Sequence, residues 1–244
     1  RLVITAAGST GSPGDETARV WDVSTGRELR RLGGGTGAVT WAALSPDGRL
    51  VATAFGIAGY GDPTASLWEL ATGRTLQRFE GHTKGITAVD FSRDGRLLVT
   101  ASYDSTARVW DVASGSLLHA LRGHGGQVYG AAFSPAGDLV VTASSDRTAR
   151  IWDVATGREL RRLEGHGVYV SAAAFSPDGR LVLTTTAADR AHLWDVETGR
   201  ELRRMEASTV LECAAFSPDG RLAVAGSLFG EVYIWDAATG RRLR

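Results

Sequence analysis

Short apolar runs separated by turn residues make up the whole chain. One stretch is representative: an apolar run from Val128 leads into a turn ending at Gly137, and a second apolar run covers Leu139–Ser144. A run of alternating character, Thr148–Asp153, and a charged run, Gly157–Leu163, complete the stretch. Runs of five to seven residues bounded by Gly, Pro or Asp are typical of β-strands and too short for helices. The pattern therefore predicts four short strands here.

This four-run unit recurs along the chain, and a Trp-Asp-type dipeptide marks its third run. The tryptophans are separated by 47, 42, 42, 42 and 41 residues; they are Trp21, Trp68, Trp110, Trp152, Trp194 and Trp235. A fixed period near 42 residues indicates one supersecondary unit repeated about six times. The period runs from end to end without a linker, so we predict a single domain over residues 1–244.

The turn after the first run shows how each unit folds back on itself. It reads Ser-Pro-Asp-Gly at Ser45, Ser176 and Ser217. Pro presets φ, Asp bonds the backbone two residues on, and Gly accepts positive φ, so the turn is a hairpin. A sheet of four short antiparallel strands has two apolar faces and cannot stand alone, so successive sheets must stack around an axis. The predicted fold is an all-β, six-bladed β-propeller.

The repeat also predicts blade boundaries and a strand count. The first blade, about 1–32, lacks its innermost strand, and five full blades follow, giving 23 strands in all. The full blades are expected at about 36–79, 83–121, 125–163, 167–205 and 208–244. The chain begins at Arg1 without an initiator Met, so we expect it to be a segment of a longer polypeptide.

Charge and cysteine content exclude several classes of partner and site. The chain carries 27 basic and 27 acidic residues, which removes a general electrostatic case for nucleic acid or an anionic membrane. The single cysteine, Cys213, cannot form an internal disulfide, and we expect it to be a small buried hydrophobe. No apolar run approaches the roughly 18 residues of a membrane span. A cytoplasmic location is the simplest expectation.

Three Gly-His pairs, each followed about 28 residues later by Trp-Asp, make the chain resemble the WD40-repeat family; the pairs begin at Gly81, Gly123 and Gly165. In that family His, Ser/Thr, Asp and Trp form a hydrogen-bonded tetrad within a blade. The resemblance implies two complete tetrads here, which are His82, Thr100, Asp104 and Trp110, and His124, Thr142, Asp146 and Trp152.

The other repeats depart from this pattern. The repeat of Trp194 keeps His166 and Thr184 but has Ala188 in the Asp position, with Asp189 one residue late. The repeat of Trp235 has Ala225 and Phe229 where Thr and Asp are expected. The two N-terminal repeats keep a threonine and an aspartate but lack the histidine; the residues concerned are Thr5, Asp15, Gly35, Thr53 and Asp62. The complete tetrads should therefore lie in the most rigid sheets.

Neither metal binding nor catalysis is expected. The three Gly-His histidines recur every 42 residues on different sheets, so no chelating spacing exists. His119 and His192 are expected to be surface strand residues. A catalytic site would need a nucleophile and base, or paired carboxylates, converging on the axis. Acidic residues fall mainly in the repeated turns and after Trp, which argues against an enzyme. No cofactor and no small-molecule substrate are expected.

The loops on one face vary more between repeats than those on the other. They include two insertions, Gly8–Gly14 and Gly56–Gly61, and exposed loops on a rigid scaffold are common binding sites. Aromatic and apolar side chains map to this variable face, where they are candidate anchors: Tyr60, Tyr103, Tyr129, Tyr169, Leu228 and Phe229. Lys84, Asp62 and Glu212 leave the face mixed in charge, which again disfavours nucleic acid. The alternative is that some of these residues only pack beneath loops.

The resemblance implies a non-catalytic scaffold that binds a protein or peptide on the variable face. The similar, Arg- and Ala-rich repeats look like bacterial WD40 arrays, which often form the sensor end of a larger signalling or defence protein. Two alternatives stay open: a purely structural or oligomerisation module, and a propeller enzyme.

Overall fold

The computed structural model describes residues 1–6, 17–33, 39–56 and 63–244. All regular structure in these residues is β-strand, arranged as six antiparallel sheets whose strand order follows the chain. The chain divides into two compact units, Arg1–Ala120 and Leu121–Arg244. Six antiparallel sheets of this kind fit the predicted β-propeller.

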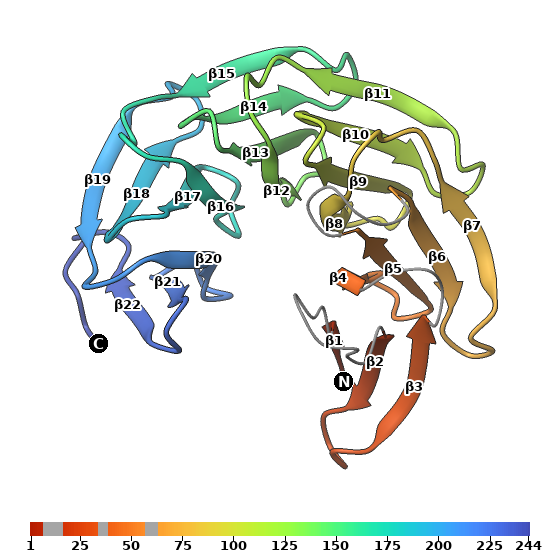
Figure 1. The fold of residues 1–244 in the computed structure, drawn as a ribbon. Coiled ribbons are helices and arrows are strands. Elements are labelled where there is room, and N and C mark those ends of the chain that lie inside the picture. Colours follow the sequence, from red (N-terminus) through yellow and green to blue (C-terminus); the bar gives the residue numbers. More distant parts are fainter. Residues whose placement is uncertain (7–16, 34–38, 57–62) are drawn as a thin grey trace. The chain divides into compact units, whose positions relative to one another are not determined.

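The first unit contains three sheets (Figure 1). The first sheet has β1 (Leu2–Ala6), β2 (Thr17–Asp22) and β3 (Glu28–Gly33). The second has β4 (Val39–Leu44), β5 (Leu50–Phe55), β6 (Ala65–Glu69) and β7 (Thr75–Phe79). The third has β8 (Ile86–Phe91), β9 (Leu97–Ser102), β10 (Thr106–Asp111) and β11 (Leu117–Arg122), the last running over the boundary between the units.

The second unit also contains three sheets. The fourth sheet has β12 (Val128–Phe133), β13 (Leu139–Ser144), β14 (Ala149–Asp153) and β15 (Glu159–Leu163). The fifth has β16 (Val170–Phe175), β17 (Leu181–Thr186), β18 (Arg190–Asp195) and β19 (Glu201–Glu206). The sixth has β20 (Leu211–Phe216), β21 (Leu222–Ser227) and β22 (Val232–Asp236). Within this unit β15 and β19 are outer strands, and β12, β16 and β20 are inner strands (Figure 1).

The described residues form 22 strands, and the prediction of 23 was wrong at the sixth sheet. The expected fourth strand is reduced there to one isolated bridge between Trp235 and Arg242. Leu243 donates its backbone N–H to the Ile234 carbonyl, and Ile234 donates to the carbonyl of Arg244. Because only this short stretch pairs with β22, no continuous fourth strand forms. The first sheet contains three strands in the described residues.

Consecutive sheets within a unit share an apolar core. In the second unit, Val141 and Ile151 of the fourth sheet pack with Val170, Val182 and Trp194 of the fifth. A second cluster joins the fifth and sixth sheets and includes Leu193, Met205 and Trp235. Burial of both faces explains why the second strands are nearly continuous apolar runs and do not alternate.

The Ser-Pro-Asp-Gly turn closes as its chemistry predicts. Ser176 Oγ bonds Asp178 and accepts the backbone N–H of Leu181 at 2.9 Å, while Gly179 takes a φ of +73°. This compact turn joins inner strand β16 to β17. It leaves the opposite ends of the strands free for variable connections.

Candidate functional site

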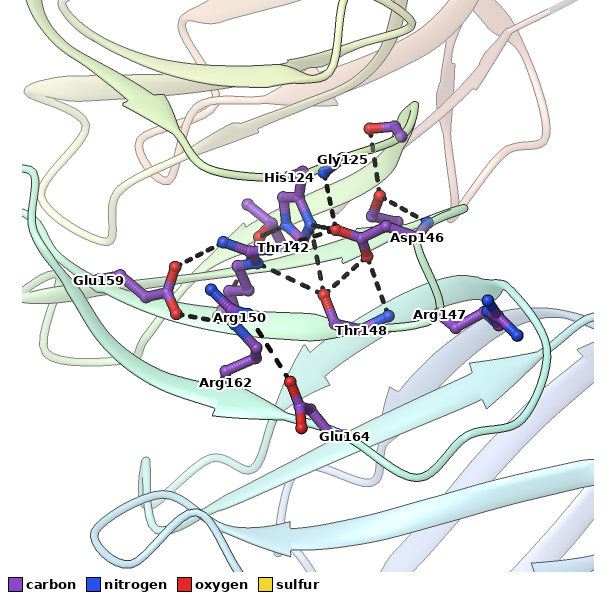
Figure 2. Close-up of polar contacts among 12 residues, drawn as sticks. His124, Gly125, Thr142, Asp146, Arg147, Thr148, Arg150, Glu159, Arg162 and Glu164 are labelled. Carbon is purple, nitrogen blue, oxygen red and sulfur yellow. Dashed lines mark hydrogen bonds and ion pairs between the residues drawn. The ribbon is translucent and has the colours of Figure 1, made fainter.

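The fourth sheet contains a closed hydrogen-bond network around His124 (Figure 2). His124 Nδ1 lies 2.8 Å from Asp146 Oδ2, and its Nε2 lies 2.7 Å from Thr142 Oγ1. Trp152 donates its indole N–H to the same Thr142 oxygen at 2.9 Å. A carboxylate only accepts, so the imidazole proton sits on Nδ1 and Nε2 accepts the Thr142 hydroxyl proton.

Charged groups extend this network toward the outer strand. Arg150 is buried; its Nη1 lies 2.6 Å from Glu159 Oε2 and its Nη2 lies 3.3 Å from Asp146 Oδ2 (Figure 2). Burial raises the pKa of Asp146, but hydrogen bonds from Thr148 and His124 outweigh burial and hold the pKa well below its usual range. Burial also lowers the pKa of His124, opposed by the Asp146 carboxylate. At neutral pH the site therefore holds a neutral imidazole against an ionised carboxylate.

The third sheet repeats the arrangement. His82 Nδ1 lies 2.8 Å from Asp104 Oδ2, His82 Nε2 lies 2.8 Å from Thr100 Oγ1, and Trp110 donates to Thr100 at 3.0 Å. The structure thus brings together both sets of four residues that the resemblance implies.

The remaining sheets keep only parts of this network. In the fifth sheet Thr184 bonds His166 at 3.0 Å and Trp194 at 2.9 Å, but His166 Nδ1 meets the Arg147 carbonyl at 3.2 Å in place of a carboxylate. In the sixth, Ala225 offers no acceptor, and the buried Trp235 Nε1 lacks a hydrogen-bond partner within the described residues. The first two sheets keep the bonds Trp21–Thr5 and Trp68–Thr53. Asp15, Gly35 and Asp62 lie outside the described residues.

Two expectations about single residues were wrong, and a third residue is only partly exposed. His192 is buried, with 1% of its surface exposed, because sheets pack against both faces of β18. Cys213 is exposed and pairs with Gly226 of β21. Burial alternates along β21 and β22, so one face of the sixth sheet is less covered than the other, and Cys213 lies on the less covered face. His119 is half-buried on the outer strand β11.

Two of the candidate anchors lie together in the first unit. Tyr103 donates its backbone N–H to the Gly85 carbonyl at 3.1 Å, which places it beside the exposed Lys84 at the approach to β8. Tyr103 is half-buried, and burial raises the pKa of its hydroxyl. Tyr60 and the insertions Gly8–Gly14 and Gly56–Gly61 lie outside the described residues, apart from Gly56.

Four candidate residues and Leu228 lie at one end of the second unit. The rings of Tyr129 and Tyr169 pack with centroids 5.5 Å apart. Leu228 and Phe229, in the turn between β21 and β22, are exposed at 62% and 73%, and Tyr169 is exposed at 41%. The Leu228 N–H bonds the Val210 carbonyl, which holds this turn beside the exposed Glu212.

Outer-strand arginines have a structural role that the sequence did not reveal. Arg161 of β15 donates Nε and Nη2 to the Glu197 carbonyl of the fifth sheet at 2.9 and 2.7 Å. Arg203 of β19 reaches the Ala238 carbonyl of the sixth sheet at 3.1 Å, and Arg30 of β3 reaches the Leu70 carbonyl of the second at 3.2 Å. Each arginine stem also passes close to the glycine of the turn it clamps: Gly199, Gly240 or Gly73. The sequence signal that could have indicated this role is the recurrence of Arg at the third position of these outer strands.

The described residues hold no group of three His, Cys, Asp or Glu side chains placed to bind one metal ion. Nor do they include a helix long and apolar enough to cross a bilayer.

Five consecutive segments match the family model described as "WD domain, G-beta repeat": residues 26–69, 73–111, 115–153, 157–195 and 199–236. No curated protein sequence matches the chain. Each segment starts at or just before the outer strand of one sheet and ends with the third strand of the next, so the sequence repeat joins neighbouring sheets. WD40 domains are typically non-catalytic and generally mediate protein–protein interaction or scaffolding. The matched segments span most of the chain, which therefore belongs to the WD40-repeat family.

Proposed function

We propose that this chain is a non-catalytic recognition module that binds a protein or peptide through a docking surface on the unit Leu121–Arg244. The docking surface consists of Tyr129, Tyr169, Glu212, Leu228 and Phe229. Lys84 and Tyr103 are proposed as a second contact group at the approach to the third sheet.

The observation that carries the proposal is the exposure of large apolar side chains on short, well-anchored connections. Phe229 and Leu228 present most of their surface to solvent, and Tyr169 presents 41%. Scattered exposed apolar residues are ordinary, but a group of them on one surface is typical of an interaction site. Aromatic side chains supply a large contact area at low entropy cost, so they commonly dominate binding energy.

Strand direction gathers these residues at one end of the unit. Tyr129 and Glu212 lie near the start of inner strands β12 and β20, and Tyr169 directly precedes inner strand β16. Ser171 at the start of β16 donates its hydroxyl to the Leu211 carbonyl at 2.7 Å, so the starts of β16 and β20 are adjacent. Leu211 in turn pairs with Ser227, which places the turn carrying Leu228 and Phe229 at the same end.

The chemistry of the surface favours a polypeptide partner. The docking surface combines two tyrosines, the apolar side chains of Leu228 and Phe229, and one carboxylate, Glu212. The whole chain has no net charge at pH 7. Nucleic acid binding depends on clustered cations. We further propose that the module is the cytoplasmic sensor part of a larger bacterial signalling or defence protein; the support for this is the similarity among its repeats, which resembles bacterial arrays.

The test is quantitative capture of partners followed by affinity measurement with purified components. Tyr169→Ala and Phe229→Ala should each weaken binding by about 1–2 kcal/mol without changing the unfolding transition. Leu160→Ala is the matched control, because this outer-strand leucine is exposed at 44% and should leave affinity unchanged. Affinity lost in the Leu160 variant and kept in both aromatic variants would place binding on the outer strands. If the surface mediates only self-association, the measured molecular mass should rise with the concentration of the chain, and Phe229→Ala should abolish this rise.

A further inference from the structure

The fifth sheet contains two buried histidines in direct ring contact. His166 precedes β16, and His192 lies in β18; their ring centroids are 4.9 Å apart at an interplanar angle of 62°. Both rings also pack on Trp194, at 4.9 and 5.9 Å. Both histidines are buried: His166 is 5% exposed and His192 is 1% exposed. Two imidazoles this close cannot readily both carry a charge.

Their hydrogen bonds suit two neutral rings. His166 donates Nδ1–H to the Arg147 carbonyl, and its Nε2 accepts the Thr184 hydroxyl proton, since Thr184 Oγ1 already accepts from Trp194. His192 donates Nδ1–H to Glu201 Oε1 at 2.8 Å. His192 Nε2 is buried and has no hydrogen-bond partner within the described residues. A proton added to His192 Nε2 would create a buried donor with no acceptor. A proton added to His166 Nε2 would create a second donor on that ring, facing the Thr184 hydroxyl.

The charged groups around the pair give little compensation for a proton. Among the residues that the structure describes, the carboxylate that acts on both rings is Glu201 of β19, which also pairs with Arg204 at 2.8 Å. Arg190 of β18 adds another positive charge near His192. Thr184 of β17 is uncharged, and the turn between β13 and β14 supplies only the Arg147 carbonyl. Ala188 stands where the fourth sheet has Asp146.

We propose that the fifth sheet is an acid-sensitive element, in which protonation of the His166–His192 pair opens the segment 164–169 leading into β16 more than acid opens the corresponding segment 122–127 of the fourth sheet. The segment is the part most directly affected, because His166 is its anchor to Thr184 and to the Arg147 carbonyl.

The direction of the pH effect follows from the His166 pKa. Burial, and then the neighbouring His192, lower this pKa from 6.5 to about 4. Since the folded-state pKa lies below the open-state value, stability is complete above pH 6.5 and falls as the pH drops toward 4. The opening equilibrium should rise roughly tenfold per pH unit over this window and level off below it.

Opening would also affect the docking surface, because segment 164–169 ends at Tyr169, which packs on Tyr129. Partner affinity should then fall at acidic pH. This consequence rests on the proposed function, whereas the opening itself is measured on the chain alone.

The test uses the full chain and exchanges the two networks. Ala188→Asp with His192→Arg gives the fifth sheet the carboxylate and the arginine of the fourth, and Asp146→Ala with Arg150→His does the reverse. Ala187 donates its N–H to the Tyr169 carbonyl at 3.1 Å, and Ser145 donates its N–H to the Gln127 carbonyl at 2.9 Å. Hydrogen exchange of these two amides, compared at pH 7.5 and 5.0 after correction for intrinsic rates, reports opening of segments 164–169 and 122–127. Denaturant unfolding at both pH values reports global stability.

In the unaltered chain, acid should increase opening of 164–169 by more than tenfold over that of 122–127. The first exchange should remove this excess, and the second should transfer it to 122–127. The proposal is overturned if acid opens both segments equally in the unaltered chain, a result that does not require either variant to fold. It is also overturned if the first exchange folds and keeps the excess. Acid-dependent opening of 164–169 with unchanged partner affinity would count against the proposed docking surface alone.

Discussion

The fourth and fifth sheets are neighbours built from similar sequence repeats, yet they bury their histidines in different electrostatic surroundings. In the fourth, His124 faces the Asp146 carboxylate, and Arg150 links that carboxylate to Glu159. In the fifth, Ala188 replaces the carboxylate, and a second histidine, His192, replaces the arginine. His192 keeps the link to the outer strand through Glu201, the counterpart of Glu159.

The difference shows which part of the network is kept in most sheets. The Thr–Trp bond is present in the first five sheets, with donor–acceptor distances of 2.8–3.0 Å. The carboxylate is more dispensable, and its loss goes with loss of the buried arginine. An arginine left at position 192 would be a buried cation with only Glu201 as a partner, which is a costly arrangement. Substitution of both residues together avoids this cost.

The largest expected effect is removal of the carboxylate where it is paired. Asp146→Ala should reduce the free energy of unfolding by about 3 kcal/mol, because it leaves the His124 donor and part of the buried Arg150 guanidinium unpaired. Denaturant unfolding measures this loss. The matched control is Asp189→Ala in the fifth sheet, where the side chain is 57% exposed and contacts only Arg190 at 3.9 Å in an ion pair. Equal destabilisation by both variants would contradict the assignment.

A smaller effect should be equal in the two sheets. Thr142→Val and Thr184→Val each remove an acceptor for the tryptophan N–H and a donor to the histidine. Each should cost about 2 kcal/mol, because both threonines are completely buried and the unpaired groups cannot reach water. Thermal unfolding of the two variants side by side tests the equality. A much smaller cost in the fifth sheet would mean that its network is already broken.

The smallest effect concerns the link between the two sheets. Arg161→Ala removes two hydrogen bonds to the Glu197 carbonyl and should cost about 0.5–1 kcal/mol. Arg162→Ala is the control, since Arg162 lies on the same strand but pairs with Glu159 of that strand and with Glu164 just after it, and so makes no link to the fifth sheet through these ion pairs. The measurement is the denaturant midpoint of each variant. Indistinguishable midpoints would show that the hydrogen bonds from Arg161 to the Glu197 carbonyl add no stability.

Features set by local sequence could be predicted, and features set by stacking between sheets could not. The strands and turns follow from the 42-residue period, and the residues around His82 and His124 follow from the resemblance to the WD40-repeat family. His192 was predicted to be a surface residue of its strand. The structure buries that position in the third, fourth and fifth sheets, as Arg108, Arg150 and His192 show.

The role of Arg161 was missed for the same reason. Its acceptor, the Glu197 carbonyl, lies 36 residues away in the sequence and on another sheet. A strand considered alone shows only an exposed arginine, for which solubility is a sufficient explanation. Exposure of Cys213 depends on how well its face of the sixth sheet is covered, which a strand considered alone does not show.

The most direct measurement is a pH titration of the histidine ring signals by NMR in the unaltered full-length chain, with His124 and His166 assigned by substitution. If the carboxylate is what separates the two sheets, His166 should titrate near pH 4 and clearly below His124, with its proton on Nδ1 at neutral pH. A His166 that titrates near 6.5, at or above His124, would contradict the electrostatic difference between the sheets.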